Sequence, residues 1–209
     1  MTLVETIEGL SGWLTEHVCS QISLKEPNDD INDAEYEVKY IHPTAFPLYI
    51  PGRKYLPPGV SAPTPAICVQ FLKGTDDIIK RQRKVDIQLS LSCWNPGEQG
   101  NELYTKQGPS DDLTRFRFLR KKAGTQSYVR NLEGWRDVVN FVDLTVRTLE
   151  GVEAINGQRI MTEDGIEFGM FQDDEGGVWE FYPQWMMYVK FALESGTTPK
   201  YPAAYEQFL

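Results

Sequence analysis

The chain has 209 residues, 41% of them hydrophobic and 24% charged, which is enough apolar material for the core of one domain, with or without an extension. Its formal net charge of -9 argues against a general nucleic-acid-binding protein, because such proteins usually present a basic face. No segment reaches the roughly 18 apolar residues that a membrane helix needs, and the N-terminal residues are acidic where a signal peptide would be basic. We therefore expect a protein made in a cytoplasm, with no membrane partner.

The first part of the chain predicts one helix, a weak strand and a stiff connection. Apolar residues recur at helical spacing over residues 2–24, behind a capping box formed by Thr2 and Glu5. Residues 35–41 alternate weakly and predict a strand. Seven prolines in the segment 43–65, the Pro-rich loop, predict a long connection without helix. This loop either packs across its own domain or is covered by a partner.

Two clearer strands follow the Pro-rich loop. Residues 66–72 are a nearly continuous apolar run, typical of a strand covered on both faces, and a turn follows them. Residues 84–94 alternate between apolar and polar side chains. The odd positions from Val85 to Cys93 predict a covered face, and the even positions from Asp86 to Trp94 predict a polar face.

Beyond a glycine-containing loop, residues 101–130 fit neither neighbour and are interpreted as an inserted arm. Residues 132–151 predict a helix capped by Asn131 and ended by Gly151. Its predicted buried stripe consists of Trp135, Val138, Val139, Val142, Val146 and Leu149.

The last part of the chain predicts two or three strands and a tail. Turns are expected at 156–157 and 173–177, and Pro183 within the run 178–193 implies an edge strand or a bulge. Residues 195–209 form a C-terminal tail. This order predicts a single α+β domain over residues 1–209: an antiparallel or mixed β-sheet, two main amphipathic helices packed on one face, and an extended arm.

No pattern in the sequence predicts a catalytic residue, a metal site or a cofactor. Cys19, Cys68 and Cys93 are far apart among apolar residues, which favours buried free thiols over a nucleophile or a metal site. His17 and His42 are outside ligand spacing of each other and of any cysteine. The glycine-containing loop matches neither GxGxxG nor GK[ST], so phosphate binding is not expected.

Adjacent aspartates occur in turn-like surroundings at 29–30, 76–77, 111–112 and 173–174. Aspartate in a turn usually accepts hydrogen bonds from nearby backbone amides, and we expect that role here. The alternative is a small enzyme that acts through paired carboxylates or through Mg²⁺ held by them.

Aromatic and apolar residues occur in places that need not be core: the Pro-rich loop, the arm, the final strand and the tail. They indicate subunit contacts, since Tyr, Trp, Phe, Met and Arg are enriched in protein interfaces. The basic stretches 79–84 and 115–122 are either solvated charge or a contact with an acidic partner surface. The predicted interface residues lie in the arm and the tail: Arg115, Phe116, Arg117, Phe118, Arg120, Lys121, Lys122, Tyr201, Tyr205 and Phe208.

Four pieces of the sequence carry a family resemblance. They are the N-terminal amphipathic helix, the strand APTPAICVQFLKGTDD, the strand and loop KVDIQLSLSCWNPGEQG, and the helix GWRDVVNFVDLTVRTL. In this order they resemble the tail terminators, or tail-completion proteins, of phages and phage-like particles from Gram-positive bacteria. The block IEFGMFQDDEGGVWEFYPQWMMYVKFAL is similar to the family's final pair of strands. The arm and the long Pro-rich loop depart from the family's usual pattern.

The resemblance implies a structural virion protein of the tail and neck, assembled in the host cytoplasm. It implies a ring, commonly a hexamer, that caps the tail tube, stops its polymerisation and joins it to the neck or connector. It implies no enzymatic activity and no cofactor. The implied partners are further copies of the chain, the tail tube protein, the neck or connector protein and the sheath protein. Genomic DNA would pass through the lumen without specific binding, and acidic walls suit this passage because they repel phosphate. The alternative within the particle is another neck or head–tail joining protein.

Overall fold

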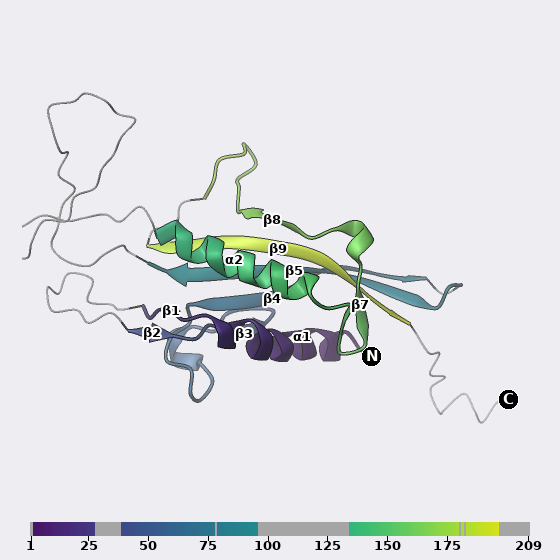
Figure 1. Cartoon of the computed structure of the whole chain (residues 1–209), viewed down its shortest axis with the longest axis horizontal. Helices are drawn as coiled ribbons and strands as arrows, with labels where there is room; N and C mark the ends of the chain where they lie inside the picture. The colour runs from purple at the N-terminus through teal and green to yellow at the C-terminus, as the bar shows by residue number, and fades with distance from the viewer. Residues whose placement is uncertain are drawn as a thin grey trace, which may run out of the picture.

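Three long strands form the centre of the protein, and two helices lie against them (Figure 1). This computed structural model describes residues 2–27, 39–77, 79–95, 134–179, 181 and 183–196, with the backbone alone at residue 162. The elements in chain order are α1 (Leu3–His17), η1 (Cys19–Gln21), β1 (Leu24–Lys25), β2 (Tyr40–Ile41), β3 (Thr44–Pro47), η2 (Arg53–Tyr55), β4 (Ala66–Asp77), β5 (Gln82–Trp94), α2 (Trp135–Glu150), β6 (Ala154–Ile155), β7 (Gln158–Ile160), η4 (Thr162–Asp164), β8 (Glu167–Met170) and β9 (Gln184–Gly196).

The main sheet is mixed, with the order β3-β4-β5-β9-β7-β6 and with β8 paired to the same edge of β9 as β7. All its pairings among the described residues are antiparallel except that of β3 with β4, which is parallel. A separate two-stranded sheet joins β1 and β2. The predicted α+β class, with an antiparallel or mixed sheet and two helices, is therefore confirmed.

The predicted capping box begins α1, but the helix is shorter than predicted. The Thr2 backbone N–H donates to Glu5 Oε2 (2.7 Å), and the Glu5 N–H donates to Thr2 Oγ1 (3.2 Å). The helix ends at His17 rather than near residue 24. Just beyond it, the side chains of Ser20 and Gln21 donate to the carbonyl oxygens of the last turn, which replaces continued helical bonding.

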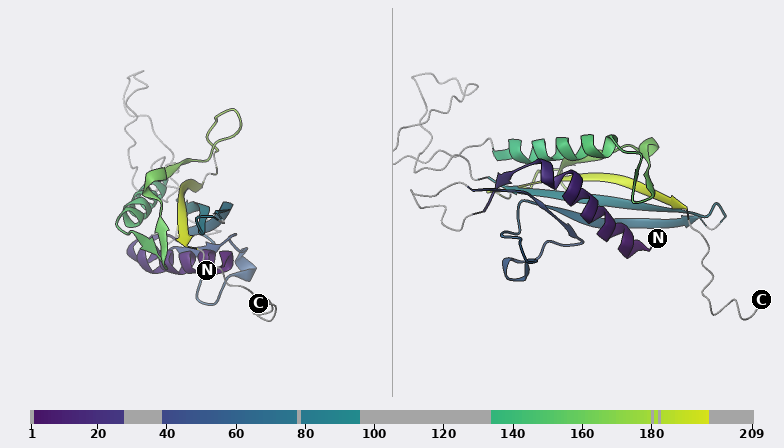
Figure 2. Two further views of the ribbon diagram at one scale, coloured as in Figure 1. Left: turned by 90° about the vertical axis from the view of Figure 1, so that its right-hand side faces the viewer. Right: turned by 60° about the horizontal axis from the view of Figure 1, so that its bottom comes forward.

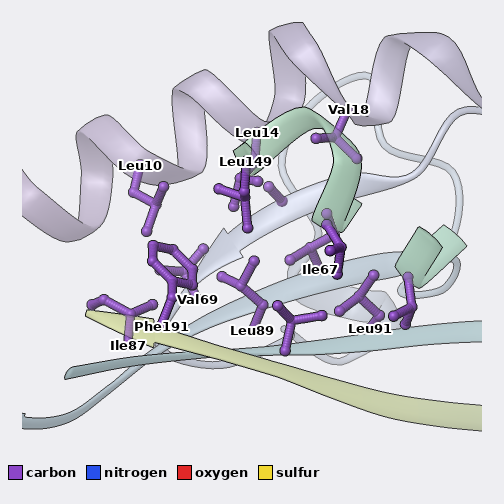
Figure 3. Packing of buried hydrophobic residues seen from close by; sticks show 14 of the residues in the cluster. Leu10, Leu14, Val18, Ile67, Val69, Ile87, Leu89, Leu91, Leu149 and Phe191 are labelled. Atoms are coloured by element: carbon purple, nitrogen blue, oxygen red, sulfur yellow. The ribbon is translucent and has the colours of Figure 1, made fainter. Parts of the chain in front are cut away.

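Both helices pack on one face of the sheet, and this face is the main core. In Figure 3, Leu10, Leu14 and Val18 point from the α1 side toward the labelled side chains of the sheet. The right-hand view of Figure 2 shows α2 lying along the long strands and α1 crossing them obliquely. The predicted covered face of β5, from Val85 to Cys93, belongs to this core. Each fully buried Leu or Phe here contributes about 1.5–3 kcal/mol by leaving water.

The predicted stripe of the second helix is correct in its middle and wrong at its start. Val138, Val142, Val146 and Leu149 are buried, but Trp135 is 44% exposed. The indole of Trp185, which is partly buried against the core, lies close to Gly134, the residue before Trp135, where an added Cβ would be 2.5 Å from Trp185 Nε1.

The boundaries of α2 also differ from those predicted. Its N-cap is Gly134 rather than Asn131, which lies outside the described residues. Gly151 is the C-cap as predicted, although its φ of -76° is not left-handed. The stripe also contains Phe141, which is fully buried and which the sequence analysis omitted.

The opposite face of β4, β5 and β9, called here the second face, is partly covered by the Pro-rich loop. Ser92 and Trp94 of β5 are buried there, so the prediction of a wholly polar face is wrong at this end. The loop supplies the cover: it contains strand β3, and its Phe46 and Ala62 are buried. The first of the two alternatives for this loop, packing on its own domain, therefore holds for part of its length.

The final strand is central rather than an edge. β9 pairs with β5 along thirteen residues and with β7 and β8 on its other side. Pro183 lies just before the strand begins, where it removes no ladder hydrogen bond, and its carbonyl oxygen accepts from the Asn95 N–H (3.0 Å). The predicted turns at 156–157 and 173–177 are confirmed by the β6–β7 pairing and by the Gln172–Val178 bridge.

Candidate functional site

A groove of about 380 Å³ lies on the second face, where the Pro-rich loop no longer covers the sheet. Its floor comes from β4, β5 and β9. One wall is the start of the Pro-rich loop and the other is the segment 171–181, which stands away from the sheet as an extended hairpin in the left-hand view of Figure 2. The lining residues are Leu48, Tyr49, Ile50, Cys68, Gln70, Gln88, Ser90, Phe171, Trp179, Phe181 and Met186.

The floor of the groove carries a small polar network. Gln70 Oε1 accepts two hydrogen bonds, one from Gln88 Nε2 (3.0 Å) and one from Ser90 Oγ (2.7 Å). These bonds hold the three side chains side by side across β4 and β5. Among the described residues, the Gln70 amide N–H groups and the Gln88 carbonyl oxygen have no partner, so the floor offers both a donor and an acceptor to a ligand.

The first wall is set by a tight turn directly after β3. Leu48 donates its backbone N–H to Val69 (2.8 Å), which is the last contact of β3 with β4. The Tyr49 N–H then donates to the Pro47 carbonyl oxygen (2.8 Å), and Leu48 between them has a φ of 65°. This is a γ-turn of the strained kind, which costs about 1–3 kcal/mol. It directs the chain away from the sheet and leaves Tyr49 69% exposed on the wall.

The second wall is a hairpin whose turn is closed by Asp173. Its carboxylate accepts the backbone N–H groups of Glu175 (3.0 Å) and Gly177 (2.6 Å), which is the role predicted for aspartates in turns. The hairpin presents Trp179, 50% exposed, with its ring edge-on to that of Phe181 at 5.6 Å. Aromatic side chains therefore stand open to solvent on this wall.

A charged contact anchors the base of this wall to β9. Phe171 packs edge-on against the ring of Tyr188, with centroids 5.6 Å apart. The Tyr188 hydroxyl and Lys190 Nζ both donate to Glu167 Oε1, at 2.9 and 3.2 Å. The Tyr188 hydrogen bond, followed by Lys190, lowers the pKa of the Glu167 carboxyl, and the same bond raises the pKa of Tyr188.

The groove is suited to binding rather than to nucleophilic chemistry by its own residues. Burial raises the pKa of the Cys68 thiol to about 11, so little thiolate forms at neutral pH. Ser90 donates to an amide oxygen, which is not a base that could activate it. The aromatic walls suit apolar side chains or a cation over a ring, and the glutamine floor suits peptide groups.

A second polar cluster fixes the point where the arm leaves and rejoins the described chain. Asn95 is 5% exposed, and its side chain accepts from Lys25 Nζ (2.9 Å) and donates to Asp137 Oδ2 (2.6 Å). Its backbone oxygen accepts from Trp185 Nε1 (3.0 Å). At Gly134 a Cβ would lie 2.5 Å from that same oxygen, so only glycine allows this approach. Both roots of the arm are therefore held at one end of the sheet.

The predicted interface residues cannot be placed in this geometry. Arg115, Phe116, Arg117, Phe118, Arg120, Lys121, Lys122, Tyr201, Tyr205 and Phe208 lie outside the described residues, as does the glycine loop at 96–100. They stay predictions.

The other basic stretch, 79–84, makes ion pairs within the chain. Arg83 forms two bonds to Asp76, at 2.6 and 2.7 Å, and Lys84 contacts Asp164 at 2.6 Å. These partners raise the pKa values of Arg83 and Lys84. This favours the interpretation of 79–84 as locally balanced surface charge.

The remaining candidates have structural contacts. Asp77 accepts the backbone N–H groups of residues 79 and 80, as predicted for a turn. His17 stacks on Trp13 at 4.7 Å, and His42 Nδ1 lies 2.8 Å from the Ile22 carbonyl oxygen. The three cysteines are free and buried, as predicted. In the part of the chain that the structure describes, no group of three or more His, Cys, Asp or Glu side chains could hold a metal ion, and no helix is long and apolar enough to cross a membrane.

Comparison with family models, curated proteins and solved structures finds no match for this chain.

The groove as a unit was not predicted from the sequence. The aromatic residues of the Pro-rich loop and of the final block were predicted to lie outside the core, and they form the two walls. Gln88 and Ser90 were predicted only as the polar side of an alternating strand. A strand pattern shows which face a side chain is on, but it does not show what lies across that face.

Proposed function

We propose that this chain is the ring-forming tail terminator of a phage or phage-like particle: a structural subunit that caps the tail tube, stops its polymerisation and joins it to the neck. The observation that carries the proposal is the open aromatic groove on the second face. Tyr49, Trp179 and Phe181 gather there in contact with solvent, and clustered exposed apolar side chains mark interaction sites.

The placement of the chain segments supports a head-to-tail arrangement. β5 pairs with β9 from Gln82–Gly196 at one end to Trp94–Gln184 at the other. At about 3.3 Å per residue, a strand of thirteen residues is about 40 Å long. The arm begins after residue 95 at one end, and the C-terminal tail continues from residue 196 at the other. Segments that leave opposite ends of a subunit can contact two different neighbours, as a heterologous ring contact needs.

The family resemblance gives the ring its place in a particle. The strands and helices that carry it are α1, β4, β5, α2 and the β8–β9 block, and they form one connected sheet and core. These elements supply the floor and the second wall of the groove, and the Pro-rich loop supplies the first wall.

Reconstitution with the matching tube protein tests this function. The tail tube protein encoded beside this chain is polymerised with and without the purified chain, and tube lengths and end structures are measured by electron microscopy. We expect shorter tubes that carry a ring of extra density at one end. A variant chain that lacks residues 103–128, most of the arm, should fold but cap the tubes poorly. Unchanged tube lengths with bare ends would contradict the proposal, and a ring bound only to the head connector would favour another neck protein.

A further inference from the structure

The hairpin that forms the second wall of the groove has an acidic turn. Asp173, Asp174 and Glu175 lie in this turn, beyond the lining residues Trp179 and Phe181. The Asp173 carboxylate accepts hydrogen bonds within the turn, but the side chains of Asp174 and Glu175 are exposed and bond no other described residue. The surface therefore combines aromatic walls, an amide floor and a negative edge, and its ligand should be aromatic and basic at once.

One segment of this chain has that chemistry. Residues 115–122, RFRFLRKK, contain five basic side chains and no acid, in a protein whose net charge is -9. We infer that the groove binds residues 115–122 of a second copy of the chain. In an extended peptide, successive side chains point to opposite sides. Phe116 and Phe118 would then enter the groove together, while Arg115 and Arg117 remain at its mouth, where the acidic turn of the hairpin attracts them.

A neighbouring copy, rather than the same copy, supplies the segment because the proposed ring needs a contact between two different surfaces of the subunit. The arm is rooted at Asn95 and Gly134, at one end of the sheet, and the groove opens on the second face. A contact between two different surfaces is heterologous and can repeat around a ring. This inference rests on the proposed ring, and it assigns the surface that receives the arm.

Peptide binding to the full-length chain tests the groove itself. A fluorescent peptide of residues 113–124 is titrated with the protein, and anisotropy is followed. We expect saturable binding that weakens as salt is added, because part of the attraction is between exposed charges. Trp179→Ala should weaken binding about tenfold or more, as for a central aromatic contact. Trp135→Ala, which removes an exposed tryptophan on α2, should leave it unchanged.

Two altered peptides and one altered protein complete this test. In the peptide, replacing Phe116 and Phe118 by Ala should abolish binding. Replacing its three arginines by Glu should abolish binding to the wild-type protein. The protein with Asp174→Lys and Glu175→Lys should prefer that acidic peptide. No saturable binding, or equal affinity of Trp179→Ala and wild type, would overturn the inference.

A charge-swap mixture tests whether the contact is between copies. One full-length variant carries Asp174→Lys and Glu175→Lys, and the other carries Arg115→Glu, Arg117→Glu and Arg120→Glu. Each variant alone should sediment as a smaller species than wild type, because its groove and segment repel each other. An equimolar mixture should restore the wild-type association, since every groove then meets a segment of opposite charge on the other variant.

The outcomes separate this inference from the proposed function. A mixture that stays dissociated while the peptide binds would show that the segment is not exchanged between copies, and the inference would be overturned. Tube capping by variants that fail to bind the peptide would leave the tail-terminator function standing without this contact. Peptide binding with no capping would reject the function and keep the groove.

Discussion

Replacing Asn95 by Ala should destabilise the protein more than any other single polar change at the roots of the arm. The side chain makes two hydrogen bonds to charged groups, Lys25 at 2.9 Å and Asp137 at 2.6 Å, and is 5% exposed. Hydrogen bonds to charged groups contribute about 1.5–3 kcal/mol each. Because Lys25 and Asp137 are half-buried and can regain water or meet each other, we expect a loss of about 2–3 kcal/mol in the free energy of unfolding.

Urea denaturation followed by circular dichroism measures this loss. For a chain of this size, 2–3 kcal/mol corresponds to a fall in melting temperature of about 4–12 °C. The matched control is Asn140→Ala, an exposed asparagine on α2, which should be neutral or slightly stabilising because alanine is the better helix former. If Asn95→Ala changed stability no more than Asn140→Ala does, the polar cluster would not hold the roots of the arm.

Three further predictions concern packing, thiol reactivity and titration. Gly134→Ala should destabilise the protein by about 1–3 kcal/mol, because its Cβ would lie 2.5 Å from a backbone oxygen. Gly12→Ala, whose Cβ would lie in open space, should not destabilise it, and the urea midpoints of unfolding of the two variants measure the difference. Cys68, with its pKa raised to about 11, should be alkylated slowly at about pH 8, and its alkylation rate should rise about tenfold with each pH unit until the pH reaches its pKa. A rate equal to that of the unfolded chain would refute this. In Glu167→Gln the pKa of Tyr188 should fall, as tyrosinate absorbance would show. Because the pKa of Glu167 is lowered in the folded protein, this residue stabilises the fold above the usual glutamate range, and that stability is lost as the pH falls through the lowered pKa. Glu167→Gln should therefore not show this loss of stability at acidic pH.

The elements with strong local signals were predictable from the sequence. The capping box of α1 and the alternation of β5 are read from neighbouring residues, and the structure confirms both. The errors occur where a distant segment decides the outcome. Trp135 fits the helical stripe of α2, yet it is 44% exposed, whereas Trp185, fifty residues further on, packs partly buried against the core beside Gly134. Pro183 predicted an edge strand or a bulge, but the strand begins after it and lies at the centre of the sheet.

The candidate site shows the same division. The sequence indicated that the Pro-rich loop and the final block carry more aromatic side chains than a small core needs. It could not show that these two segments, more than a hundred residues apart, face each other across one groove.

By itself, the sequence determined the α+β class, the helix-covered face of the sheet and the buried state of the three cysteines, because periodicity and composition act over short distances. Only the tertiary structure decided that the second face is half covered and half open. That depends on the parallel pairing of β3 with β4 and on the strained turn at Leu48, where the Pro-rich loop leaves the sheet and becomes the first wall of the groove. Such pairings are set by the packing of the whole sheet, and a residue's nearest neighbours in the chain do not encode them.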